Sequence, residues 1–533
     1  MSNSIFKHFR KDFPASIIVF LVAVPLCLGI AVASDAPPLS GIIAGIIGGI
    51  IVGTMSNSAL GVSGPAAGLA VIVANSINDL TPENESLLYG FEIFLVAVII
   101  GGIIQLILGF LKGGIVGYYF PNSIINGMLA GIGVTIFMKQ IPHAFGLYEL
   151  SEGKLFNVVN NLDKTVIGAL IICSLSIFIL FLWERPFMKK NKIFKLIQGP
   201  LIVVALGILL NQLFISYFPS IALVKDEFLV RLPVSKTVDE FKNLIAFPNF
   251  AVALTDIKVY ITGGVIALVA SLETLLCLEA TDKIDPDKRI SDPNKELKAQ
   301  GVGNIISGLI GGLPVTQVIV RSSANIQSGG KSKLSAIIHG FLILFSLLLF
   351  PGLLNKLPIA SLAAILFMVG YKLASPAKFK EMIKKGWRQF IPFAATVGLI
   401  YYVDMLVGIG VGLAIAIFII LFNNFRTPYF WKPENQEKGA PITLRLSENV
   451  TFLNKAAMLK TLKSIPNQSH VIIDATNNVR IDDDVKEIID DFKIAAVPKE
   501  IKLEIKGFEE ILPEDSDKAY HKALEGDLFV ESK

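Results

Sequence analysis

Residues 299–333 read AQGVGNIISGLIGGLPVTQVIVRSSANIQSGGKSK, and this stretch decides how the rest of the chain is interpreted. A glycine-rich apolar segment ends at Gly312, Pro314 follows, and a short apolar run continues to Ile326. The run is too short to cross a bilayer alone, which takes about 20 apolar residues in a helix. We therefore expect a broken helix at membrane depth, which is tolerated where it lines a cavity.

Pro314 is expected to open this short helix, because the first turn has no use for the missing N–H. A helix N-terminus carries roughly half a positive charge and binds anions. Arg321 would lie about two turns further along, and Gln317, four residues before it, would share its face. The alternative is an ordinary loop at Pro314, with Arg321 reaching the cytoplasmic surface.

An earlier stretch, residues 61–68 (GVSGPAAG), repeats this arrangement. It follows a glycine-rich apolar segment, residues 41–53, and opens a second short run that ends near Asn75. Two short segments interrupted by Gly or Pro, one in each half of a chain, indicate a transporter site between repeats. We expect their N-termini to face each other and to form a positive site with few charged side chains.

The composition indicates a polytopic membrane protein with a soluble tail. The chain has 533 residues, 53% hydrophobic and 17% charged, with a mean hydropathy of +0.63, whereas soluble domains carry about 25% charged residues. The net charge of +4 indicates no nucleic-acid partner. The cysteines and histidines show no metal-ligand spacing. The sequence shows neither paired carboxylates nor a nucleophile–base motif, so it does not favour an enzyme.

Apolar segments between residues 14 and 425 predict fourteen membrane spans, seven in each half. The halves are approximately residues 14–215 and 256–425, and an odd number of spans per half requires them to be inverted. Short loops rich in Lys and Arg follow the even-numbered segments from six to fourteen, and residues 1–13 are also basic. This pattern places both termini in the cytoplasm.

The composition changes after Arg426. Residues 426–440 are predicted to be a linker, and residues 441–533 a small cytoplasmic α/β domain. The predicted strands are residues 442–446, 471–473 and 501–505, and the predicted helices are residues 454–464 and 484–492.

With these residues in place, the chain resembles the SulP family of inorganic anion transporters. The resemblance rests on residues 24–25 and 36–41, on Ser63-Gly64-Pro65, and on residues 304–330. Residues 451–454 and 471–474 resemble the STAS domain of that family. The resemblance implies an all-α membrane domain of two inverted seven-segment repeats, split into core and gate. It also implies a homodimer in the cell membrane and an elevator-like mechanism.

The resemblance also implies where the anion binds, between the third and tenth helices. The substrate-binding residues would be Ser63, Gly64, Pro65, Ala66, Ala67, Pro314, Val315, Thr316, Gln317 and Arg321.

Glu273 lies near the middle of the eighth predicted span, where a carboxylate is costly and functional by default. It could carry a proton, bind Na⁺ with oxygen from Thr274, or pair with Arg321 in a structural ion pair. Sodium-coupled relatives carry a hydroxyl four residues after this carboxylate, whereas this chain has Cys277. No cofactor is expected, apart from Na⁺ as one candidate coupling ion.

The sequence therefore predicts a secondary transporter for a small oxyanion, sulfate or bicarbonate, coupled to H⁺ or Na⁺. The alternative is an uncoupled anion exchanger or channel for chloride-like anions on the same fold.

Overall fold

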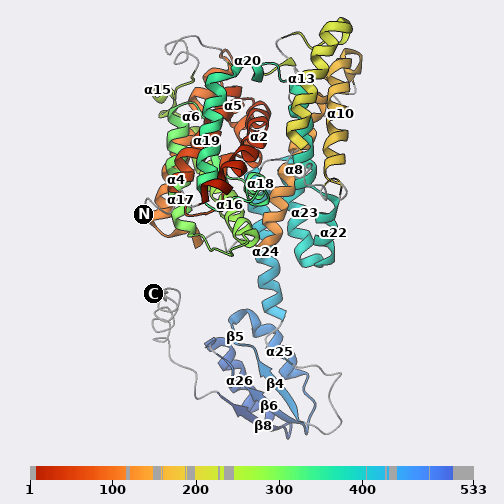
Figure 1. Ribbon diagram of the computed structural model, residues 1–533. Helices are drawn as coiled ribbons and strands as arrows, with labels where there is room; N and C mark the ends of the chain where they lie inside the picture. Colours follow the sequence, from red (N-terminus) through yellow and green to blue (C-terminus); the bar gives the residue numbers. More distant parts are fainter. Residues whose placement is uncertain are drawn as a thin grey trace. The chain divides into compact units, whose positions relative to one another are not determined.

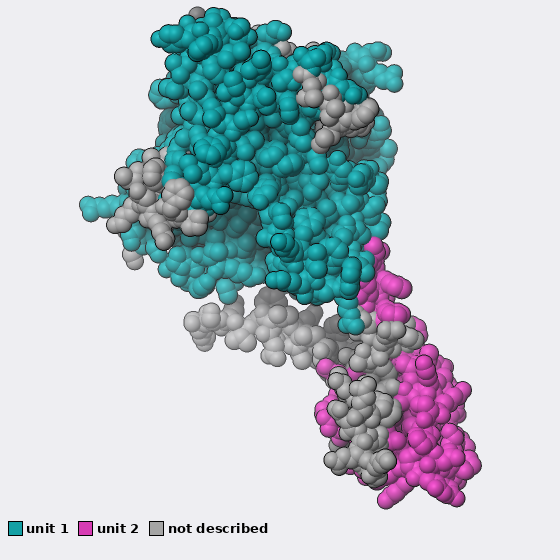
Figure 2. Space-filling model, turned by 90° about the vertical axis from the view of Figure 1, so that its right-hand side faces the viewer, with its two compact units in different colours: residues 1–413 teal, residues 414–533 magenta. Residues whose placement is uncertain are grey.

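The computed structural model describes residues 8–115, 121–147, 158, 160–185, 188, 199–225, 228–232, 245–403, 405–426, 429–430, 441–478 and 480–507. The chain forms two compact units, Met1–Leu413 and Ala414–Lys533, which are coloured separately in Figure 2. The first unit holds the long apolar helices, and the second holds a small sheet with two helices.

The main helices of the first unit, labelled in Figure 1, follow one another along the chain. They are α2 (Phe9–Ala33), α3 (Pro38–Ile47), α5 (Ala70–Leu80), α6 (Leu87–Phe110), α8 (Asn122–Ala144), α10 (Ile167–Trp183), α13 (Gly199–Tyr217), α16 (Ile257–Ile284), α17 (Pro293–Leu309), α18 (Ile319–Gln327), α19 (Leu334–Leu349), α21 (Ile359–Leu373), α22 (Pro376–Lys384) and α23 (Trp387–Tyr402). Helix α24 (Met405–Arg426) continues into the second unit.

Seven helical stretches in the described part of the chain are long and apolar enough to cross a membrane. They are Phe9–Ala33, Pro38–Met55, Leu87–Phe110, Asn122–Ala144, Gly199–Tyr217, Ile257–Ile284 and Ile359–Lys384. Four shorter apolar helices accompany them: Ala67–Leu80, Ile167–Trp183, Leu334–Leu349 and Val407–Phe422. The polytopic helical architecture is thus confirmed, and the count of fourteen spans stays a prediction.

The helices of the first unit fall into two groups. Helices α16 and α17 pack against α6, and α19 packs against α3 and the π-helical turn η2 (Gly48–Val52). Helices α21 and α23 pack against α8, and α10 packs against α13 and α21. In Figure 1 the two groups occupy opposite sides of the unit, and α2 contacts members of both.

The prediction that Pro314 and Pro65 open helices is wrong. Ser63–Pro65 is a strand, β1, and Val315–Gln317 is a strand, β2. They pair antiparallel, with Ser63 opposite Gln317 and Pro65 opposite Val315. Helix α18 begins only at Ile319, so Gln317 does not share a helix face with Arg321. The backbone groups of each strand find partners in the other strand instead of within a helix.

Side chains of α17 support this two-stranded ladder. The Asn304 amide accepts a hydrogen bond from Val315 N and donates one to Val315 O at 3.0 Å. The Ser307 hydroxyl donates to Leu313 O at 2.7 Å. Beyond the ladder, Val318 N donates to Val62 O at 3.0 Å. The unwound backbone is therefore bonded on both sides.

The second unit confirms the α/β elements predicted for the tail. Strand β4 (Ile442–Leu446) pairs in parallel with β6 (His470–Asp474), which pairs in parallel with β8 (Lys502–Lys506); the short β3 (Tyr429–Phe430) adds an antiparallel edge, and β5 (Asn449–Val450) pairs with β7 (Arg480–Ile481). Helices α25 (Lys455–Lys463) and α26 (Asp483–Ala496) bury Met458 and Ile489 in one core with Leu444 and Ile473. Apolar and polar residues alternate in the strands, and apolar residues recur with a period of 3.6 in α26, which explains why the prediction succeeded.

We predict that Gly340→Ala destabilises the first unit by about 1–3 kcal/mol, the usual cost of overpacking. A Cβ at Gly340 would lie 2.8 Å from Ile50 N and 2.9 Å from the Gly49 carbonyl carbon, and backbone cannot move aside as a side chain can. Thermal unfolding in detergent measures the loss. Gly264→Ala is the matched control, because no atom lies within 4 Å of its added methyl group. Equal melting temperatures for the two variants would contradict the tight contact between α19 and η2.

Candidate functional site

Arg321 lies in the first turn of α18, and its side chain is wholly buried. Nη2 donates to Cys27 Sγ at 3.3 Å, whereas Nε and Nη1 have no hydrogen-bond partner in the protein. The alternative that Arg321 reaches the cytoplasmic surface is therefore wrong. A buried cation with unused donors is costly unless an anion joins it.

Strand β1 passes directly beside the guanidinium group. A Cβ built at Gly64 would collide with Arg321 Nη1. Only glycine, therefore, allows this strand to approach the cation so closely. Among the other predicted residues, Pro65 and Ala66 are also buried, and Ala67 begins the single turn η3 (Ala67–Leu69) that leads into α5.

Strand β2 is fastened to α16 through Gln317. Its backbone N–H donates to Thr274 Oγ1 at 3.3 Å, and its side-chain Nε2 donates to Thr281 Oγ1 at 3.1 Å. Thr274, predicted to help bind a coupling ion, thus holds β2 by a hydrogen bond. Thr316 Oγ1 and Gln317 Oε1 are buried without a protein partner, so polar atoms remain unpaired on β2, beside buried Pro314 and Val315.

Glu273 lies on α16 against the start of η3. Its side chain is 9% exposed, Gly68 N–H bonds to the carboxylate, and Oε2 has no partner. A Cβ at Gly68 would lie 2.8 Å from both carboxylate oxygens. No ion pair joins Glu273 to Arg321, both of which the structure describes. The structural ion pair weighed from the sequence is therefore not formed.

Sequence reasoning missed a row of buried polar side chains on α17. Glu296, Gln300 and Asn304 are wholly buried and spaced by four residues, which places them on one helix face. Gln300 Nε2 donates to Ser63 Oγ at 2.8 Å, and Asn304 Nδ2 donates to Gln105 Oε1 at 2.7 Å. The four-residue spacing was the available signal.

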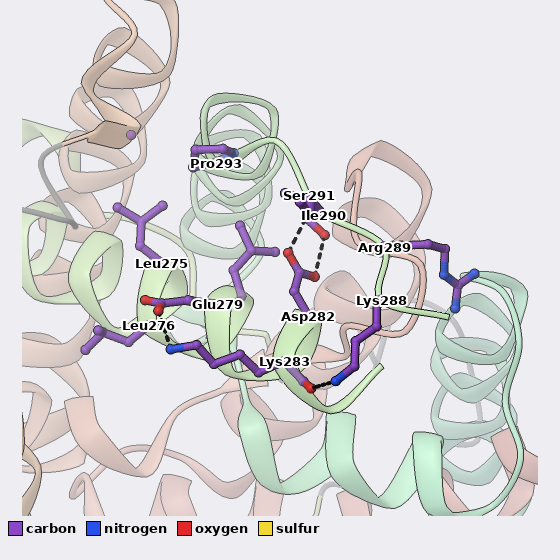
Figure 3. Close-up of a pocket in the computed structure, with 12 residues that line it drawn as sticks. Leu275, Leu276, Glu279, Asp282, Lys283, Lys288, Arg289, Ile290, Ser291 and Pro293 are labelled. Carbon is purple, nitrogen blue, oxygen red and sulfur yellow. Dashed lines mark hydrogen bonds and ion pairs between the residues drawn. The ribbon is translucent and has the colours of Figure 1, made fainter. Parts of the chain in front are cut away.

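A separate cavity of about 400 Å³ lies where α16 ends and the chain turns into α17 (Figure 3). None of the residues predicted for the substrate or the coupling ion lines it. Arg289, at its edge, makes an ion pair with Asp285 and donates from Nη1 to Lys331 O at 2.9 Å. Burial opposes ionisation of Asp285, but its hydrogen bonds with Arg289 outweigh that effect and lower its pKa. These bonds fasten the loop before α17 to the loop after α18.

A model of the sulfate permease family matches residues 9–396, which span both unwound segments and α16. The chain belongs to the sulfate permease family.

Individual relatives are similar over most of this chain. YvdB of Bacillus subtilis (strain 168) is 28% identical over 416 residues, 77% of this chain and 73% of YvdB. The bicarbonate transporter BicA of a Picosynechococcus species is 24% identical over 414 residues, 77% of this chain and 70% of BicA. The inward-facing structure of the murine anion transporter Slc26a9 shares the fold, with a TM-score of 0.73, 16% identity and coverage of 97% of this chain and 88% of that one.

We predict that Gly64→Ala weakens anion binding while leaving the protein folded. The added methyl group meets the end of the Arg321 side chain, which can swing aside, so the guanidinium is displaced and the backbone is not. Loss of one hydrogen bond from a charged donor corresponds to roughly a ten-fold loss of affinity or more. Binding of radiolabelled sulfate to purified protein measures the change. Wild-type affinity in the variant would contradict the prediction that Arg321 binds the anion.

Proposed function

We propose that this protein is a secondary active transporter that moves a small inorganic oxyanion, sulfate or bicarbonate, by an elevator-type alternating-access mechanism. The observation that carries the proposal is the buried guanidinium of Arg321, which holds two unused donors beside paired strands from opposite halves of the chain. The two helix groups would be the core and gate of two inverted seven-segment repeats. Relatives of this kind are transporters rather than enzymes.

The chemistry around Arg321 suits an oxyanion. A planar guanidinium can donate two parallel hydrogen bonds to two oxygens of one anion. The N-terminal end of α18 adds partial positive charge. Thr316 and Ser63 offer hydroxyl groups on the two strands. Together with Arg321, they belong to the ten residues that the sequence predicts for substrate binding.

The named functions of relatives narrow the substrate class. The family is called after sulfate permeases, and BicA is a bicarbonate transporter. Both anions are small and carry several acceptor oxygens. These oxygens can accept hydrogen bonds from the unused donors of Arg321.

Glu273 would couple anion binding to a cation. The carboxylate accepts a hydrogen bond from Gly68 N–H in η3, four residues after Gly64, which lies against Arg321. Protonation removes a negative charge beside the anion site, so bound proton and bound anion would stabilise each other, as linkage requires. With Na⁺ instead, Glu273 would stay ionised and oxygens such as those of Thr274 and Thr316 would complete the shell. Because Cys277 stands where sodium-coupled relatives carry a hydroxyl, and a thiol is a poor ligand for so hard a cation, we favour the proton.

The remaining parts of the proposal concern assembly. The α/β unit at the C-terminus would be a cytoplasmic STAS-type domain, and the chain would form a homodimer in the cell membrane with both termini in the cytoplasm. The strand order β3-β4-β6-β8 with helices α25 and α26 supports the domain assignment.

The proposal is tested by comparing the uptake of radiolabelled sulfate and bicarbonate into proteoliposomes by the wild-type protein and by Arg321→Ala. The KM for the transported anion should rise at least ten-fold, because the variant removes the buried cation that would face it. Arg445→Ala, in the second unit, is a control that removes an exposed arginine. Uptake that never occurs with either anion would overturn the transporter proposal, and large currents without a cotransported cation would favour a channel.

Glu273→Gln should abolish accumulation driven by a proton gradient while sparing exchange of anion for anion. The amide keeps the shape of the protonated carboxyl group but cannot release a proton. Paired measurements of gradient-driven uptake and counterflow separate the two activities in one preparation. Accumulation that still follows an imposed proton or sodium gradient at wild-type strength would place the coupling elsewhere.

A further inference from the structure

Helix α17 carries a buried carboxylate, Glu296, that the proposed transport cycle does not use. Its side chain is wholly excluded from solvent. Oε2 accepts a hydrogen bond from the Ser56 hydroxyl, and Oε1 accepts one from Gln300 Nε2 at 2.8 Å. Among the described residues, no cation makes an ion pair with Glu296. The carboxylate is therefore satisfied by neutral donors alone.

Gln300, one helical turn later, connects this carboxylate to the anion site. Its Nε2 also donates to Ser63 Oγ at 2.8 Å. An amide nitrogen has two hydrogens, so one is used on Glu296 and the other on Ser63. Gln300 is wholly buried, and its Oε1 has no partner in the protein.

The carboxylate decides which end of the amide faces Ser63. An ionised carboxylate only accepts hydrogen bonds, so it requires the NH₂ group of Gln300 on its side. The same nitrogen then faces Ser63, whose oxygen accepts and whose single hydrogen stays free for another acceptor. With the amide reversed, the Gln300 oxygen would take the Ser63 hydrogen.

We propose that Glu296, acting through Gln300, is a positioning residue that holds the Ser63 hydroxyl as a donor to the transported oxyanion. The inference rests on the proposed function, because it takes the anion to bind beside β1. Ser63 lies opposite Gln317 in the ladder and next to Gly64, against which Arg321 packs. Its hydrogen adds one directed neutral donor to the charged donors of Arg321.

A double-mutant cycle tests the inference, with KM and maximal rate measured for radiolabelled sulfate and bicarbonate uptake by the full chain in proteoliposomes. Ser63→Ala should raise the KM about ten-fold or more, because a hydrogen bond to a charged ligand is lost. Glu296→Gln should raise the KM with less effect on the maximal rate. In the Ser63→Ala background, Glu296→Gln should add nothing to the KM, because the hydroxyl that it acts on is gone.

Two further variants make the cycle decisive. Ser307→Ala is the matched control, since Ser307 is a buried serine of α17 that bonds to Leu313 O; its effect on the KM should add to that of Ser63→Ala. Gln300→Leu removes the connecting amide and provides the same cycle if Glu296→Gln yields no folded protein.

Additive KM effects of Glu296→Gln and Ser63→Ala would overturn the inference, and so would an unchanged KM in Ser63→Ala. Failure of the proposed function gives a different pattern, because the wild-type protein would then take up neither anion. An anion site away from Arg321 would leave the KM unchanged in Arg321→Ala as well.

Discussion

Backbone that leaves a helix at membrane depth must find partners for its N–H and C=O groups, because the hydrocarbon offers none. That requirement organises the first unit. Strands β1 and β2 supply partners for each other, and Asn304 bonds Val315 from the other side. The Ser322 hydroxyl accepts from Val62 N, and the Asn325 amide donates to Leu60 O. Asn304 on α17 and Ser322 and Asn325 on α18 thus serve this one need.

The same unwound segment separates the two buried charges of the site. Arg321 approaches it at Gly64, and Glu273 approaches it at Gly68, four residues later. Each contact requires a residue without a side chain, since a Cβ at either position would meet the charged group. The two glycines therefore allow Arg321 and Glu273 to lie close to one short stretch of backbone, and no ion pair joins these two described residues. In the proposed mechanism, the cation would attract the anion, and the charge on the carboxylate would regulate that attraction.

Sequence reasoning picked out the two interrupted segments but mistook their local structure. The glycine and proline interruptions and the charged residues Arg321 and Glu273 within apolar segments could be recognised from local composition, and their roles in binding and coupling stay predictions. The strand pairing could not, because Ser63 and Gln317 are brought together only by the fold. A proline after glycines is compatible with a helix start or a strand, and no local signal distinguishes them. In the tail, by contrast, strand β4 was predicted at its observed bounds, because apolar and polar residues alternate over its five residues.

Which buried polar groups are structural and which are available to a ligand can be decided from how completely each is bonded. Asn304 uses both amide hydrogens, one on Gln105 and one on Val315 O, so it has no donor left for an anion. Arg289 likewise donates hydrogen bonds from all three guanidinium nitrogens, to Asp285 and to Lys331 O. Arg321 differs, since two of its nitrogens are buried and unbonded. Desolvating a cation without pairing it costs several kcal/mol, and a fold that retains such a group gains back that cost only when an anion binds. The proposed anion site therefore rests on this unpaired guanidinium more than on the helix ends around it.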